Sequence, residues 1–284
     1  MLGKTGLRSY VESNFEGKDG NKSHVSIDPD QIAMFHKNYK IIINQFPDDS
    51  YSLLQEFVRP CLDNYIRSKA VELNVNLFQE GTLASDAYID IIDFQKNGGI
   101  ARIGKRDQNL NRADVNVKGD YNIEIDVLAV HRYESLLSSY EREFSFIENG
   151  LPPRAVIAKN HDYSYNKMLE NLRKIENKNL ADNIRVFKRG DVENHPILIY
   201  ETGDKTYKDS IEAIEAEREK GRKELLKNPE KYYTRINELK KRIADRIRIK
   251  GDFGNSDILI NKINDLEKEF TLDLEKENKK GVNK

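Results

Sequence analysis

Residues 228–270 read NPEKYYTRINELKKRIADRIRIKGDFGNSDILINKINDLEKEF, and this stretch constrains the fold more than any other. Asn228-Pro229 signals the start of a helix, because a polar cap precedes a proline at the first helical position. Gly251 ends that helix, and Ser256 can cap the next one. Apolar residues on both sides of the break recur at intervals of three and four, as along one face of a helix. These residues are Ile236, Leu239, Ile243, Ile247, Leu259, Ile263, Leu266 and Phe270.

Two narrow apolar stripes joined by a short loop predict an antiparallel, coiled-coil-like helical hairpin over residues 228–280. We expect the stripes to close on each other or on a partner, so these eight residues are the predicted interface. The hairpin belongs to a charged helical arm at residues 206–284, whose first helix starts near Lys208 and has few apolar residues. The arm therefore favours oligomerisation or docking of another protein.

The first helix of the hairpin is basic. Between Lys231 and Lys250, eight cations stand against two carboxylates. Contacts with nucleic-acid phosphates are one interpretation. The candidate residues are Arg235, Lys240, Lys241, Arg242, Arg246 and Arg248. Pairing with the acidic helix that follows is the preferred interpretation, because complementary flanks are common in helical hairpins.

Composition limits the class of protein. The 284 residues are 38% hydrophobic and 33% charged, which allows a real core together with a large solvated surface. A net charge of -1 argues against a protein wholly devoted to binding polyanions. Cys61 is the only cysteine and the five histidines are scattered, so we expect neither a disulfide nor a zinc site. With no apolar leader and no membrane-length run, we expect a protein of the cytoplasm, or of an assembly formed there.

A core domain is expected at residues 27–203. Residues 1–26 are polar enough to predict a flexible arm. Apolar spacing predicts helices at about 29–46 and 50–73, the second interrupted at Pro60. Alternating apolar residues then predict an antiparallel meander. Its strands are expected at 77–78, 87–94, 99–103, 113–117 and 121–130.

The rest of the core returns to mixed spacing. We expect a helix over 136–147 and then a strand–helix–strand unit at 154–159, 164–179 and 184–187, with an edge strand at 196–200. The sequence therefore predicts an α+β fold. Its N-terminal helices pack on a mostly antiparallel sheet with a βαβ-like extension, and the C-terminal helical arm follows.

One short motif matches a phosphate-binding loop. Gly3-Lys4-Thr5 has the residues with which such a loop ends. The complete loop needs a preceding strand and four residues between its two glycines, whereas two residues stand before Gly3. We therefore attribute this match to chance.

A set of acidic residues supports an enzyme hypothesis. Gly81-Thr82 follows one predicted strand, Asp90 and Asp93 lie on the next, and Glu124 and Asp126 lie on a later one. This order resembles the nucleotidyltransferase pattern, which implies a Gly-Thr turn holding a triphosphate and carboxylates binding magnesium. The resemblance makes Gly81 and Thr82 cofactor-binding residues. It makes Asp90, Glu124 and Asp126 metal ligands, and Asp93, Glu124 and Asp126 catalytic residues.

Spacing weakens that resemblance. Asp90 and Asp93 are three apart and would point to opposite faces of a strand. A nuclease is disfavoured too, because Leu128 stands where such sites carry a lysine. The preferred interpretation is the polar face of a half-exposed sheet.

The sequence thus favours a non-enzymatic structural or adaptor protein without a cofactor, such as a component of a virus particle or another large assembly. One alternative is a nucleotidyl or phosphoryl transferase that depends on magnesium. Another is a nucleic-acid-binding protein that acts through residues 231–250.

Overall fold

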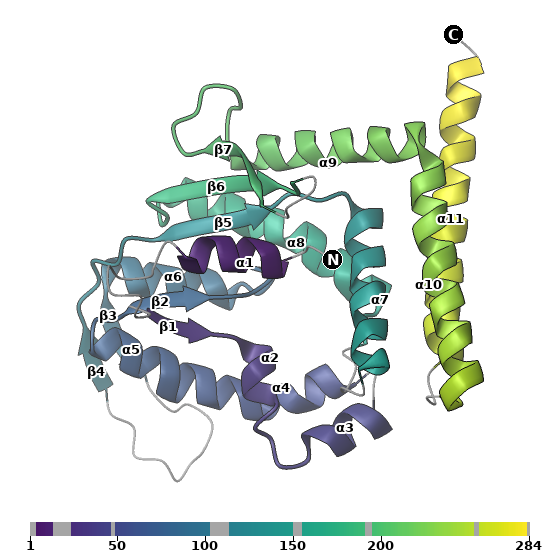
Figure 1. The fold of residues 1–284 in the computed structure, drawn as a ribbon. Coiled ribbons are helices and arrows are strands. Elements are labelled where there is room, and N and C mark those ends of the chain that lie inside the picture. The colour runs from purple at the N-terminus through teal and green to yellow at the C-terminus, as the bar shows by residue number, and fades with distance from the viewer. Residues whose placement is uncertain are drawn as a thin grey trace.

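The strands form three small sheets in the part of the chain that the structure describes. That part of the computed structural model is residues 4–13, 24–46, 49–102, 114–149, 155–190, 195–252 and 256–282 (Figure 1). Strand β1 (His24–Ile27) pairs in parallel with β2 (Asn76–Gln79), and β3 (Gly99–Arg102) pairs antiparallel with β4 (Asp114–Val117). In the third sheet, β5 (Glu124–Leu128) pairs in parallel with β6 (Asn183–Lys188), and β7 (Ile197–Glu201) pairs antiparallel with β6.

Helices surround these sheets. Those of the core are α1 (Lys4–Ser13), α2 (Pro29–Ala33), α3 (Tyr39–Gln45), α4 (Ser50–Pro60), the π-helix η1 (Cys61–Arg67), α5 (Ser68–Glu72), α6 (Ala87–Asn97), α7 (Arg132–Glu148) and α8 (Ala158–Asn177). The mixture of helices and small sheets confirms the α+β class. The described pairings are evenly parallel and antiparallel, however, so the sheet is not mostly antiparallel.

The expected meander is interrupted by a helix. Residues 87–94, predicted as a strand, belong to α6, because Ile89 and Ile92 lie three apart on one buried helical face. That face packs with Ile175 of α8 and with Leu180. Asp90 and Asp93 are therefore helical residues.

The βαβ-like unit differs from the prediction at its first strand. The parallel neighbour of β6 is β5, and the crossover between them contains α7 and α8. Ala158 already lies in α8, so 154–159 is not the strand that we expected. The predicted second strand and the edge strand are confirmed as β6 and β7.

The N-terminal segment contains a helix that its polar composition did not predict. Residues 4–13 form helix α1, and the buried side chains of Leu7 and Val11 pack with Phe187 of β6. These apolar residues are four apart, so they lie on one face of the helix. The expected flexible arm at 1–26 is wrong over α1 and again from His24, where β1 begins.

The C-terminal arm consists of α9 (Ser210–Lys227), α10 (Pro229–Lys250) and α11 (Ser256–Val282). The predicted breaks at Pro229 and Gly251 are confirmed. Gly251 has a φ of 79°, in the region that favours glycine. Helices α10 and α11 form the predicted hairpin and lie side by side along one edge of the molecule (Figure 1).

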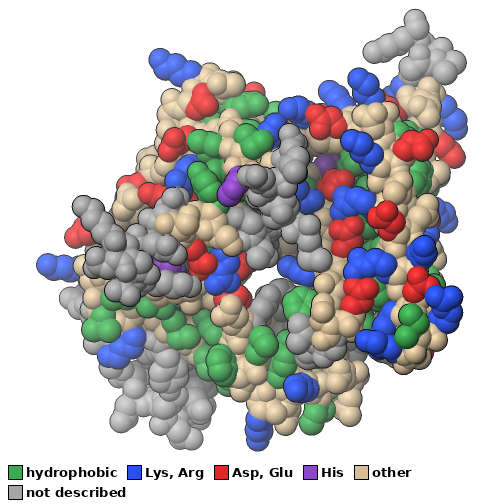
Figure 2. Space-filling view, in the orientation of Figure 1, with side chains coloured by type: hydrophobic (Ala, Val, Ile, Leu, Met, Phe, Trp, Pro, Cys, Tyr) green, Lys and Arg blue, Asp and Glu red, His purple; other side chains and the backbone are tan. Residues whose placement is uncertain are grey.

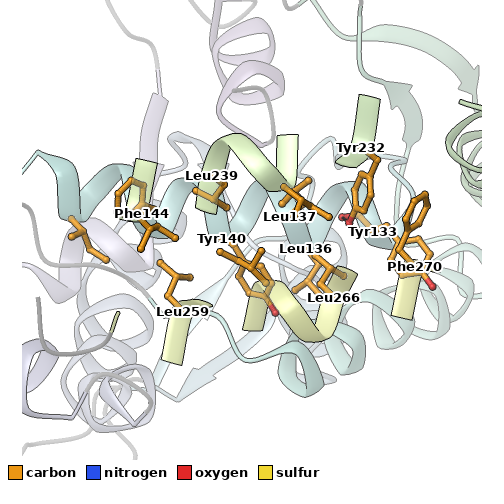
Figure 3. Close-up of a cluster of buried hydrophobic side chains, with 14 of the residues drawn as sticks. Tyr133, Leu136, Leu137, Tyr140, Phe144, Tyr232, Leu239, Leu259, Leu266 and Phe270 are labelled. Carbon is orange, nitrogen blue, oxygen red and sulfur yellow. Dashed lines mark hydrogen bonds between the residues drawn. The ribbon is translucent and has the colours of Figure 1, made fainter. Parts of the chain in front are cut away.

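The hairpin closes on α7 of the core. Tyr133, Leu136, Leu137, Tyr140 and Phe144 point from α7 toward α10 and α11, as Figure 3 shows. All of these side chains are buried. The arm is therefore part of the hydrophobic core. No described helix is long and apolar enough to cross a membrane.

Candidate active site

Two carboxylates meet where the first parallel strand pair ends. Asp28 directly follows β1 and Glu80 directly follows β2. The register pairs Ile27 with Gln79, and the Glu80 amide donates to the Ile27 carbonyl at 3.1 Å. Asp28 and Glu80 are therefore neighbours across the strand pair, at its carboxyl end. Asp28 also accepts a hydrogen bond from the Gln31 amide at 3.4 Å, in the first turn of α2.

Arg8 of α1 joins these two carboxylates. Its Nη1 lies 2.9 Å from Asp28 Oδ2 and 3.2 Å from Glu80 Oε2. Its Nη2 donates to Glu12 and to Ser26. The pKa of the guanidinium is raised, first by the hydrogen bond to Glu12 and then by the charges around it. Arg8 is thus a permanent cation that holds both carboxylates at one edge of the strands.

Gly81 and Thr82 follow Glu80 directly and are exposed. A Cβ on Gly81 would lie 2.7 Å from the hydroxyl of Tyr88, so a larger residue would displace that side chain. Asn171 of α8 anchors the end of this segment, because its Nδ2 donates to the Leu83 carbonyl at 3.0 Å. These two predicted binding residues therefore lie beside the carboxylate pair on an anchored, accessible turn.

A hollow faces this edge. Both parallel pairs point their carboxyl ends toward α7 (Figure 1), and Figure 2 shows the surface hollowed between those ends and α7, with acidic and basic side chains near its rim. Helix α1 starts at Lys4 on the same side. Open α/β folds bind ligands beyond the carboxyl ends of parallel strands, and helix N-termini favour phosphates there. The arrangement is thus typical of proteins that bind phosphorylated ligands.

The acidic set expected from the sequence does not assemble. Asp126 accepts two hydrogen bonds from Arg185 of β6, at 2.7 and 2.9 Å, and Glu124 lies 3.1 Å from the same guanidinium. On α6, Asp93 accepts from Asn97 at 2.6 Å and Asp90 is exposed. No group of three potential metal ligands occurs among the described residues. Glu124 and Asp126 thus form the polar face of β5, while Ile125 and Val127 pack into the core.

Several cations of α10 pair with carboxylates inside the chain. Arg235 contacts Glu134 at 2.5 Å and Glu141 at 2.9 Å, both on α7. Arg242 pairs with Glu148 of α7, and Lys240 contacts Glu267 of α11 at 2.5 Å. Arg246 donates to the Gly251 carbonyl and Arg248 to Asp245, while Lys241 is exposed. Acidic partners within the chain therefore neutralise four of the eight cations, two of them through α7 and one through the acidic third helix.

The eight predicted interface residues are inside the protein. All but Ile247 are buried, and Ile247 packs against the same cluster. Their apolar stripes are already covered by each other and by α7. They form an intramolecular interface in this structure.

Comparisons with known proteins identify the family of the chain. The Zeta toxin family profile matches residues 2–100 and 105–200, more than half of the chain, so the chain belongs to the zeta toxin family. Toxin PezT of Streptococcus pneumoniae serotype 4 is 26% identical over 188 residues, which are 66% of this chain and 64% of PezT. The match thus spans less than two thirds of that relative.

A solved structure has a similar fold. It comes from the characterization of the PezAT chromosomal toxin–antitoxin system of Streptococcus pneumoniae. The TM-score is 0.54 at 21% identity, over 84% of this chain and 82% of that one. This likeness supports the fold alone.

Membership of the zeta toxin family contradicts the prediction of a structural or adaptor protein. A zeta toxin is not a virion component or a structural adaptor, so the function that we favoured from the sequence is wrong. The reason for the error is visible in the site. Arg8, Asp28 and Glu80 are 20 and 52 residues apart along the chain, so no local spacing unites them. One signal in the sequence was the motif Gly3-Lys4-Thr5, which lies within the family match and whose Lys4 and Thr5 begin α1.

Proposed function

We propose that the chain is a phosphotransferase that uses a nucleotide and magnesium, and that it acts as the toxin of a toxin–antitoxin pair. The observation that carries this proposal is the pairing of Asp28 and Glu80 by Arg8 at the carboxyl end of β1 and β2, in a zeta toxin chain. The names of PezT and of the PezAT system support the toxin role and an antitoxin protein as partner.

The chemistry of this set suits phosphoryl transfer. Carboxylate oxygens are ligands that magnesium prefers, and magnesium is often held by one or two of them together with substrate phosphates. Bound there, magnesium would offset the charge on the transferred phosphoryl group. Asp28 and Glu80 supply such oxygens, and either can accept the proton of an attacking hydroxyl. Gly81 and Thr82 offer an exposed turn for the substrate beside them.

Gly3-Lys4-Thr5 takes a role in this proposal. In a phosphate-binding loop of this type, the lysine reaches the outer phosphates and the threonine hydroxyl binds magnesium at the helix start. Thr5 and Lys4 open α1, as that motif requires. The family match begins at residue 2 and so includes this motif, which supports that role over a chance occurrence. The side chains of these residues lie outside those that the structure describes.

Two variants and one control test the proposal. Asp28→Asn and Glu80→Gln should each lower phosphotransfer from magnesium-ATP by about 100-fold or more, because each removes a charge at the reacting centre. Asp126→Asn should keep the activity, because Asp126 is paired with Arg185. Transfer can be followed with radiolabelled ATP, and expression of each variant should show growth arrest that tracks activity.

The opposite pattern would be decisive. If Asp126→Asn abolished transfer and Asp28→Asn did not, the site would lie on β5, where the sequence analysis placed it. A folded wild-type chain that neither binds magnesium-ATP in a thermal-shift assay nor arrests growth would contradict the proposed function altogether.

A further inference from the structure

Hydrogen bonds to β6 and α8 anchor the turn between β5 and α7. We call residues 129–133 the β5–α7 corner. The Ala129 amide donates to the Phe187 carbonyl at 2.7 Å, and the Val130 carbonyl accepts from the Tyr165 hydroxyl at 2.9 Å. His131 caps α7 by accepting from the Tyr133 amide. Every residue of the corner up to the first turn of α7 is thus anchored.

All three helices of the arm contact this corner. From α11, Glu269 lies 2.6 Å from Arg132 Nη1, and Asp273 accepts from the Tyr133 hydroxyl at 2.9 Å. From α10, the Tyr232 hydroxyl donates to the Tyr133 carbonyl at 3.1 Å. From α9, Gly221 lies so close that a Cβ there would stand 3.4 Å from His131 Cβ. The arm therefore converges on three consecutive residues.

Arg132 ties these contacts to the core. Its Nε and Nη2 each lie 2.7 Å from a carboxylate oxygen of Asp162 on α8, while Nη1 reaches Glu269 on α11. A guanidinium presents several donors in one plane, so it can bridge two carboxylates at fixed geometry. A change in the position of α11 would therefore be transmitted to the first turn of α7.

The β5–α7 corner is connected to the candidate site through α1. The corner follows the carboxyl end of β5 and leads into α7 (Figure 1). Leu128, the last residue of β5, packs with Leu7 and Val11 of α1, the helix that carries Arg8. The corner and the carboxylate pair are thus linked through one packed helix.

We infer that the helical arm positions the β5–α7 corner for the reaction, and that Glu269 and Asp273 are positioning residues for phosphoryl transfer. This inference rests on the proposed function, and it extends that function beyond the family match, which ends at residue 200. The arm acts at a distance, because its acidic side chains touch Arg132 and Tyr133 rather than the carboxylate pair.

The test uses the full chain. The double variant Glu269→Gln/Asp273→Ala removes both acidic contacts, and Asp257→Asn/Glu275→Gln is a control that changes two exposed acids of the same helix. Hydrogen exchange should accelerate several-fold at the Tyr133 and Ser135 amides, which both donate to His131, and remain unchanged in the control. The kcat/KM of transfer at 25 °C should fall about tenfold, because small misplacements of a site are costly.

Two results would overturn the inference. One is unchanged exchange at the corner. The other is accelerated exchange with kcat/KM equal to that of the control, which would leave the arm a purely stabilising role. The activity of the wild type separates this inference from the proposed function. A wild-type chain without transferase activity would contradict the proposed function. If the wild type is active, the ratio of the kcat/KM of the variant to that of the wild type tests the role of the arm.

Discussion

His131 is a neutral cap in the folded protein. Burial lowers the pKa of its imidazole to about 4, and nearby Arg222 and Arg132 act in the same direction. In the unfolded chain the ordinary value is 6.5. Between these two values the unfolded chain binds a proton that the folded chain does not, so stability falls as the pH falls through this window. We expect His131 to account for a loss on the order of 2 kcal/mol, after allowance for its partial exposure.

Urea unfolding at pH 7, 5.5 and 4 measures this effect. His131→Asn should flatten the pH profile over that window, because asparagine also caps helices and does not titrate. Equal slopes in the wild type and the variant would show that other groups carry the pH dependence.

At the same scale, the candidate site was hidden from sequence reasoning for a physical reason. Asp28 has a local role as a helix cap, since it accepts from the Gln31 amide. Its second role depends on Glu80, which only strand pairing brings near. Gly81 and Thr82 were predicted from a resemblance to the nucleotidyltransferase turn, and in the structure they directly follow Glu80, whereas Glu124 and Asp126 pair with Arg185. A single sequence shows local caps and turns, whereas a charge cluster requires knowledge of the strand register.

At the scale of elements, local periodicity predicted α10 and α11 well, because Pro229 and Gly251 bound α10 and each helix carries its own apolar stripe. It did not predict that α7 completes their core, since that contact joins segments about a hundred residues apart. Residues 87–94 illustrate another limit. The sequence AYIDIIDF alternates like a strand while Ile89 and Ile92 also match a helical face, and packing on α8 decides between the two.

The shared core of α7, α10 and α11 can be tested at Phe270. Its ring is fully buried and lies 4.5 Å from Tyr232 and 5.4 Å from Tyr133, between ring centroids. Phe270→Ala should lower the free energy of unfolding by about 3–5 kcal/mol. It should also make the arm sensitive to limited proteolysis. Leu272→Ala, at a side chain that is 46% exposed, is the control and should change stability by less than about 0.5 kcal/mol. Similar losses in both variants would contradict the packing described here.

At the scale of the whole molecule, the arm at residues 206–284 shares its hydrophobic core with the rest of the chain, whereas the sequence predicted a separate unit. The arm covers six buried apolar side chains of α7, and Ile211 and Ile214 of α9 pack into the core of the β5–β6–β7 sheet. Each such side chain is worth roughly 1.5–3 kcal/mol when buried. Losing these contacts would therefore remove a large part of the roughly 5–15 kcal/mol that stabilises a typical domain.

A chain that ends at residue 205 should therefore fail to unfold cooperatively and should aggregate, because the apolar face of α7 would be exposed to water. A chain that ends at residue 278 is the matched control, since the residues described beyond it are exposed or lie at the end of α11, and it should unfold like the full chain. Circular dichroism during heating, with light scattering recorded in parallel, distinguishes the two. If the shorter chain kept a cooperative transition and stayed monomeric, residues 1–205 would be a complete domain with the arm as an appendage. If the shorter chain loses the cooperative transition, the unit that must fold for the site to form extends into the arm. That unit is then longer than the family match, which ends at residue 200.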